Sequence, residues 1–356
     1  MLLWYFFAGI QKQKMEKDVF FMHMADALVS PAVGGTMLAV SACAIAYSAA
    51  KIKKEDFNDK KIPIMGIMGA FVFAAQMINF TIPGTGSSGH IGGGILLASV
   101  LGPFASLITI ASVLLIQCLF FADGGLLALG CNIFNMGVIP CLIVYPLLYR
   151  LFMKNGITSK KIAIASVVSV VVGLQAGAFA VVLETLVSGI TALPFGTFAA
   201  LMQPIHLAIG LGEGIVTALV LCFIHKVRPE ILNDYNSKES INTISVRNVI
   251  ITFVILTVIT GGILSIFASQ YPDGLEWSIG GVTGSEELES GSSSAYKTAE
   301  NIQNSSAFMP DYDYKSAGEG GSSTGTSVAG ISGSLCVFAI AAAAGLVITK
   351  IKKTKV

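Results

Sequence analysis

Long apolar stretches recur along this chain, and each is long enough to cross a lipid bilayer as a helix. Crossing a hydrocarbon core of about 30 Å takes about 20 helical residues, because the backbone N–H and C=O groups must be bonded within the segment. Charged residues make up only 12% of the sequence, against about 25% in soluble domains. We therefore predict an all-α, polytopic membrane helical bundle. The stretches are Leu28 to Ala50, Ile62 to Phe80, Phe104 to Phe121, Leu126 to Phe152, Ile162 to Val187, Ile205 to Ile224, Val249 to Ala268 and Val328 to Ile348.

Basic residues gather in four places between these stretches, at 51–61, 150–161, 226–247 and 350–355. Positively charged loops stay on the cytoplasmic side of a membrane. All four clusters share that side only if the glycine-rich segment Thr81 to Leu101 also crosses, as a short broken helix packed against protein. We predict nine crossings in a multi-pass protein of the cell membrane, about seven spans followed by a two-span hairpin.

Composition changes divide the chain into four parts. A 1–21 extension precedes a unit of about seven spans at 22–226, and a polar cytoplasmic linker at 227–247 leads to the hairpin at 248–356. The hairpin encloses an acidic external segment, Gln270 to Thr326, that is rich in Gly and Ser. We expect the middle of this segment to be flexible and solvated.

Several classes of function have no support in the sequence. No GxxxxGK[ST] phosphate loop and no HExxH motif occurs, so we predict neither an ATPase site nor an enzyme. The six cysteines form no CxxC pair, which disfavours a disulfide framework or a thiolate metal site, and we expect no cofactor. A net charge of +1 gives no basic surplus for nucleic acid.

The histidines are the candidate metal ligands. His23 lies just before the first span and His90 lies in the external glycine-rich loop, so both can face a cavity open to the outside. Imidazole nitrogens brought together by the fold suit a divalent ion such as Ni²⁺ or Co²⁺. We interpret His206, at the expected start of its span, as an ordinary helix-end residue, and His225 as a residue of the membrane interface.

Four separated motifs resemble one transporter family. They are MHMADALVSP from Met22, GSSGHIGGG around His90, FADGGLLALGCNIFNMG from Phe120 and YPDGLEWS from Tyr271. The first three are similar to the substrate-binding component of cobalt and nickel energy-coupling-factor transporters, the CbiM/NikM family. The fourth holds the PDGLE signature of the small companion N component, here fused to the same chain.

The resemblance implies a planar site of four nitrogens. Its ligands would be the free amine of Met22, the backbone nitrogen and imidazole of His23, and the imidazole of His90. Such a site suits Ni²⁺ or Co²⁺ and is poor for Mg²⁺ or Ca²⁺; the choice between cobalt and nickel stays open. From the matching run we expect Asp123, Asn132 and Asn135 to orient the ligands through hydrogen bonds.

The start of the chain departs from the family pattern. Twenty-one residues precede Met22, and an internal Met22 has an amide nitrogen in place of an amine. We expect translation to begin at Met22, with removal of 1–21 by processing as the second explanation. Ala25 and Ala27 also stand where the family commonly has Pro and Gly.

The functional hypothesis is therefore a substrate-specific membrane component that binds Co²⁺ or Ni²⁺ outside and passes it inward. Its implied partners are a transmembrane coupling subunit and separate ATPase subunits. Ala42, Ala46 and Ala50 resemble the family's docking face, although packing inside the chain is the default explanation for such small residues. Two alternatives stay open, a membrane metal sensor or adaptor without transport, and a vitamin-specific component with an aromatic-lined pocket.

Overall fold

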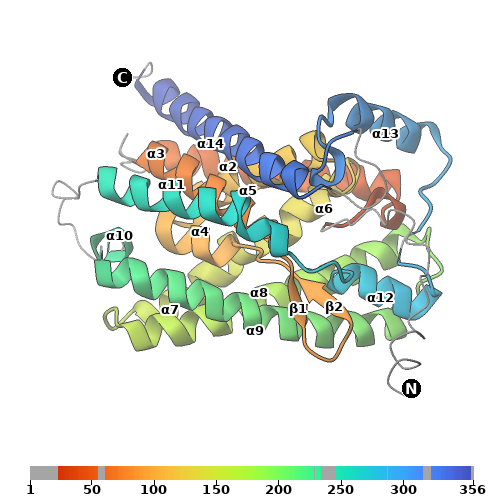
Figure 1. Cartoon of the computed structure of the whole chain (residues 1–356), viewed down its shortest axis with the longest axis horizontal. Helices are drawn as coiled ribbons and strands as arrows, with labels where there is room; N and C mark the ends of the chain where they lie inside the picture. Colours follow the sequence, from red (N-terminus) through yellow and green to blue (C-terminus); the bar gives the residue numbers. More distant parts are fainter. Residues whose placement is uncertain are drawn as a thin grey trace, which may run out of the picture.

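The computed structural model describes residues 23–54, 61–227, 229–233, 246–286, 288–315 and 322–353, and they form a bundle of long helices (Figure 1). Seven helices are long and apolar enough to cross a membrane. An eighth, α3 (Lys61–Gln76), is apolar but shorter. The predicted class, an all-α membrane bundle, is confirmed. The extension 1–21 and Met22 lie outside the described residues.

The first part of the bundle begins with a short 3-10 turn, η1 (Asp26–Leu28), and the long helix α2 (Pro31–Lys54). After α3 the chain forms a small antiparallel hairpin, β1 (Phe80–Ile82) with β2 (Ser87–Gly89). Two helices follow, α4 (Gly94–Leu101) and α5 (Pro103–Phe120). The segment Thr81 to Leu101, for which we expect a crossing, consists of this hairpin, an irregular loop and the eight-residue helix α4.

The next span is continuous from Leu129 to Met153, although its pitch changes along the way. It comprises α6 (Leu129–Ile133), the π-helical stretch η2 (Phe134–Tyr149) and α7 (Arg150–Met153). Pro140 and Pro146 lie inside η2. Proline lacks the N–H of a regular turn, and a widened π turn accommodates that loss.

Helices α8 (Ser159–Ser188) and α9 (Phe195–Val227) pack along each other, and the short α10 (Pro229–Asn233) follows. Thr158 caps α8 by accepting a hydrogen bond from the Lys161 N–H. A side chain in place of Gly214 would meet the backbone of Val167, which explains how the two helices approach closely. By contrast, Ala42, Ala46 and Ala50 on α2 are exposed.

The C-terminal hairpin is formed by α11 (Val246–Gly262) and α14 (Ser323–Lys353), both of which pack on α3. Between them lie η4 (Leu264–Phe267), α12 (Gly274–Thr283), α13 (Ser294–Ser306) and η5 (Pro310–Tyr312). The segment that we expect to be flexible and solvated contains two helices, α12 and α13, which pack on the rest of the chain. Most residues of α13 are nevertheless exposed. A capping box between Asp273 and Glu276 starts α12.

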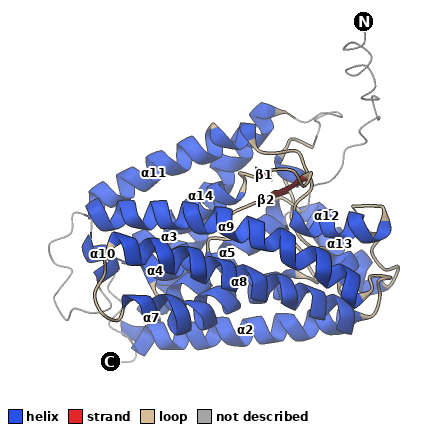
Figure 2. Ribbon diagram, turned by 90° about the horizontal axis from the view of Figure 1, so that it is seen from below, coloured by secondary structure: helices blue, strands red, loops and turns tan. Residues whose placement is uncertain are grey.

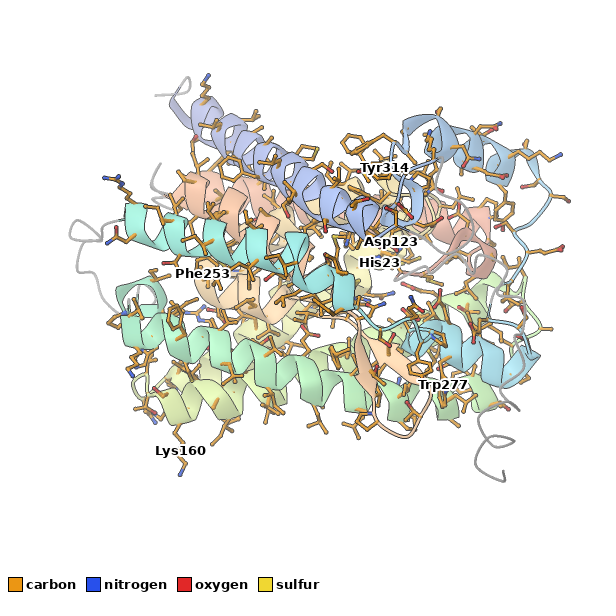
Figure 3. The ribbon with its side chains drawn as sticks, in the orientation of Figure 1. His23, Asp123, Lys160, Phe253, Trp277 and Tyr314 are labelled. Carbon is orange, nitrogen blue, oxygen red and sulfur yellow. The ribbon has the colours of Figure 1, made fainter. Side chains whose placement is uncertain are left out.

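The two ends of the bundle differ in character. The hairpin β1–β2, α12 and α13 lie at one end, and α10 and the C-terminal end of α14 lie at the other (Figures 1 and 2). Lys160 lies at the second end, whereas Trp277 lies at the first (Figure 3). Lys160, from one of the basic clusters, and Trp277, from the acidic external segment, therefore lie at opposite ends of the bundle.

Candidate metal-binding site

The main chain of Met24 is held in the bundle by one side chain. The Met24 N–H donates to Oδ1 of Asn132 at 3.0 Å, and Nδ2 of Asn132 donates back to the Met24 carbonyl at 3.1 Å. The Gly125 N–H donates to the same carbonyl at 3.0 Å. Met24 is only 2% exposed, so the segment after His23 enters the protein instead of running over its surface.

Two glycines in the loop between α5 and α6 make this entry possible. A Cβ on Gly124 would lie 2.8 Å from the Cβ of His23. A Cβ on Gly125 would overlap the carboxylate and the backbone nitrogen of Asp26. The Asp26 carboxylate accepts a hydrogen bond from the Ala128 N–H at 3.0 Å, so the loop and the N-terminal segment interlock.

The imidazole of His23 is buried, with only 3% of the residue exposed. Its Nδ1 lies 3.0 Å from Oδ1 of Asp123, yet neither ring nitrogen has a well-aligned hydrogen bond. Its ring centre lies 5.4 Å from that of His90. A buried imidazole with an unsatisfied nitrogen is costly unless something else binds it.

Asp123 is itself held from its other side. The hydroxyl of Tyr312, from η5, donates to Oδ2 of Asp123 at 2.5 Å. Burial alone would raise the pKa of Asp123, but the neighbouring His23, the Tyr312 hydroxyl and the charge of His90 hold it below its usual value. Asp123 therefore presents a carboxylate to His23 (Figure 3).

The loop that carries His90 is fixed by two buried polar side chains. Glu213 on α9 accepts the Gly93 N–H at 2.9 Å. Gln76 on α3 donates to the Gly92 carbonyl at 3.0 Å and accepts from Gln117 at 2.9 Å. Gly93 has a φ of 79°, a conformation that glycine adopts without strain. These bonds fix the backbone two and three residues after His90.

His23 and His90 face a common cavity of about 110 Å³. His206, Glu213 and Asp273 also line it, and no Phe, Tyr or Trp is among its described lining residues. The wall from the C-terminal hairpin is fixed by backbone contacts, since the Ser88 N–H of β2 donates to the Pro272 carbonyl at 2.7 Å. Burial raises the pKa of Asp273 to about 6.

The other predicted site residues have different surroundings. The amide of Asn132 hydrogen-bonds to the backbone of Met24 at both of its ends. Asn135 lines the cavity, but its amide donates to Glu184 at 2.8 Å. Met22 is not described. Within the described ranges, no three His, Cys, Asp or Glu side chains form a metal-binding group.

Sequence reasoning missed two cavity residues. His206 does not open its helix, because α9 already begins at Phe195; it lies mid-helix, and its Nδ1 is 2.7 Å from the Met202 carbonyl. The sequence indicates Asp273 only as part of the PDGLE signature and gives no sign that it lines the cavity. An acidic residue ahead of Glu276 does signal a helix start, but no local pattern shows that the helix packs beside His23.

Two family models match the sequence. The model of the cobalt uptake substrate-specific transmembrane region matches residues 23–231, and the PDGLE domain matches 247–350. A protein of Archaeoglobus fulgidus whose name includes "fused nickel transport protein NikMN" is 33% identical over 59% of this chain and 68% of its own. The "Fused nickel transport protein NikMN" of Rhodobacter capsulatus is 30% identical over 59% of this chain and 64% of its own.

A solved structure is also similar. The crystal structure of a transition metal transporter superposes with a TM-score of 0.52 at 32% identity, and the match covers 61% of this chain and 98% of that one. The matched family model alone accounts for more than half of the sequence. This chain belongs to the family of cobalt uptake substrate-specific transmembrane regions and carries a PDGLE domain at its C-terminal end.

Proposed function

We propose that this protein is the substrate-specific component of an energy-coupling-factor transporter that binds Co²⁺ or Ni²⁺ from outside the cell and passes it inward. The observation that carries the proposal is the convergence of His23 and His90 on one small cavity, with the buried His23 ring lacking an aligned hydrogen bond. Neutral imidazole is a good ligand for both ions.

The remaining nitrogens are proposed to be the backbone nitrogen of His23 and the amine of Met22. Chelation by the backbone nitrogen selects Nδ1 of the same residue, because Nε2 points away from that backbone. Nδ1 now faces Asp123, so metal capture requires the ring to turn about its Cβ–Cγ bond. The turn leaves Nε2–H on the side of Asp123, which then orients the bound ring.

A vitamin is disfavoured as the substrate. The cavity of about 110 Å³ is small and lacks aromatic lining among its described residues, whereas pockets for organic ligands of drug size measure about 300–1,000 Å³. Backbone packing of Gly92 and Gly93 against Glu213 and Val72 also leaves little room to expand.

We propose that ATP hydrolysis by other subunits drives transport, and that this chain does not hydrolyse ATP itself. We infer a transmembrane coupling subunit and ATPase subunits as partners, and the exposed small-residue face of α2, at Ala42, Ala46 and Ala50, supports a helix-docking surface. A metal sensor without a transport step would bind the ion equally well, so uptake must be measured as well as binding.

The direct test is Ni²⁺ and Co²⁺ titration of purified protein that begins at Met22, compared with the full chain and with His90→Ala. We expect tight binding by the first, and much weaker binding by the chain with 1–21 retained and by His90→Ala. His225→Ala is the matched control and should bind normally. Equal binding by all four proteins would contradict the four-nitrogen site.

A further inference from the structure

We propose that Tyr312, in the C-terminal hairpin, is a positioning residue for the metal site, acting through Asp123 on His23. The inference rests on the proposed metal-binding function and adds to it a specific role for the hairpin. It assigns part of the metal affinity of the first family domain to a side chain of the second.

The contact forms a short chain of side chains that is closed to water. Tyr312, Asp123 and His23 are 8%, 3% and 3% exposed. The Tyr312 hydroxyl donates to Oδ2 of Asp123 at 2.5 Å, and Oδ1 of the same carboxylate lies 3.0 Å from the His23 ring. Hydrogen bonds to a carboxylate are roughly twice as strong as neutral ones, so the hydroxyl fixes which way the carboxylate faces.

The ring of Tyr312 is fixed independently of its hydroxyl. It stacks on Phe121 with ring centres 4.9 Å apart and planes 14° apart. The Asp311 N–H donates to the Phe121 carbonyl at 2.9 Å. Gln303 of α13 donates to the Gly124 carbonyl at 2.8 Å. The C-terminal hairpin therefore hydrogen-bonds to the backbone on both sides of Asp123, at Phe121 and at Gly124.

Backbone strain is concentrated at the same contact. In the described part of the chain, the non-glycine residues with positive φ are Ala122 at 56°, Asp311 at 53° and Tyr312 at 57°. Such conformations are uncommon for residues other than glycine and persist where surrounding structure fixes them. Here they aim the Asp123 carboxylate and the Tyr312 hydroxyl at each other.

Once the His23 ring has turned to bind the ion, its Nε2–H donates to the Asp123 carboxylate, and such a bond orients a metal-binding imidazole and increases its basicity. Without the Tyr312 hydroxyl, the Asp123 carboxylate loses the donor that sets its orientation. The His23 ring then adopts the metal-binding orientation less often, and the affinity for the ion falls.

The test is Ni²⁺ titration of the protein that begins at Met22, in detergent, comparing wild type with Tyr312→Phe. Phenylalanine keeps the ring that stacks on Phe121, so the fold is expected to survive, which a thermal unfolding curve checks. We expect the Ni²⁺ affinity to fall about tenfold and the visible absorption of the bound ion to change.

Tyr296→Phe is the matched control. Its hydroxyl also joins the hairpin to the first domain, but it donates to the Val29 carbonyl at 2.9 Å and not to Asp123. This variant should lose comparable thermal stability while keeping the wild-type affinity and spectrum. Equal effects of the two variants on affinity, or unchanged or tighter binding by Tyr312→Phe, would overturn the positioning role.

A double-mutant cycle distinguishes an effect of Tyr312 through Asp123 from a general loss of stability. In the Asp123→Ala background, Tyr312→Phe should produce no further loss of affinity, because the carboxylate through which it acts is gone; a second tenfold loss would overturn the proposal. If wild type itself does not bind Ni²⁺ or Co²⁺, the proposed function fails. If wild type binds and Tyr312→Phe behaves identically, only the positioning role fails.

Discussion

Asn132 pairs with the main chain of Met24 as if it were a neighbouring strand, because its amide both accepts from the Met24 N–H and donates to the Met24 carbonyl. A single side chain thus fixes the residue that follows His23. His23 is the first residue that the structure describes. The hydrogen bonds of Asn132 therefore fix the backbone directly after the proposed ligands.

Removal of these hydrogen bonds should weaken metal binding. We expect Asn132→Ala to reduce Ni²⁺ affinity about 10- to 100-fold, the range typical for groups that orient ligands, as measured by isothermal titration. Asn155→Ala, at an exposed position, is the control and should bind normally. Wild-type affinity in Asn132→Ala would show that the Met24 backbone is held sufficiently by Gly125.

The approach of the N-terminal segment to the 122–125 loop depends on the absence of a side chain. We expect Gly125→Ala to lower the free energy of unfolding by about 1–3 kcal/mol, the usual cost of overpacking, because its Cβ would overlap Asp26. Gly35→Ala on α2 meets no atom within 4 Å and should be neutral or stabilising. Thermal unfolding of both variants distinguishes a local clash from a general effect of losing glycine.

Glu213 should support stability and metal binding because it accepts a hydrogen bond from the Gly93 N–H, and its negative charge should not be required. Glu213→Gln keeps a side-chain oxygen for the Gly93 N–H, whereas Glu213→Leu leaves that buried donor unpaired at a cost of about 1–3 kcal/mol. We expect the leucine variant to lose both stability and Ni²⁺ affinity, since the bond lies three residues after His90. The glutamine variant should retain most of both. If glutamine is as damaging as leucine, the charge itself is required.

Asp273 should make the stability of the metal-free protein depend on pH. Burial raises its pKa from 3.8 to about 6 in the folded protein. Between these pH values the folded chain keeps a proton that the unfolded chain releases, so stability falls as pH rises from about 4 to about 6 and then levels off.

The comparison for this prediction is Asp273→Asn, which cannot ionise and still caps a helix. Thermal unfolding across the same pH range should show wild type losing stability relative to the variant as pH rises. A difference between the two proteins that stays constant with pH would contradict the prediction.

The spans could be predicted from sequence because lipid imposes a simple length and polarity rule on each helix separately. The start of α9 was placed too late, at Ile205, because Pro204 and the polar Gln203 resemble a helix start. In the structure α9 continues through Pro204 from Phe195. The fold of the external segment was also missed, since α13 gains its stability by packing on the site and its own composition is polar.

The site was only partly predictable. His23 and His90 were identified because their motifs resemble a known family, and the structure brings their rings together. The bond between Tyr312 and Asp123 joins residues 189 positions apart, and no periodicity or short motif reports such a pairing. Polar partners that act across a bundle become visible only when the helices are assembled.

The Ser88–Pro272 backbone bond joins two parts of one polypeptide that are matched by separate family models. Their encounter is intramolecular, so its strength does not change when the protein is diluted. Each copy of this chain consequently carries one PDGLE segment for each cobalt-uptake region, at a fixed one-to-one ratio.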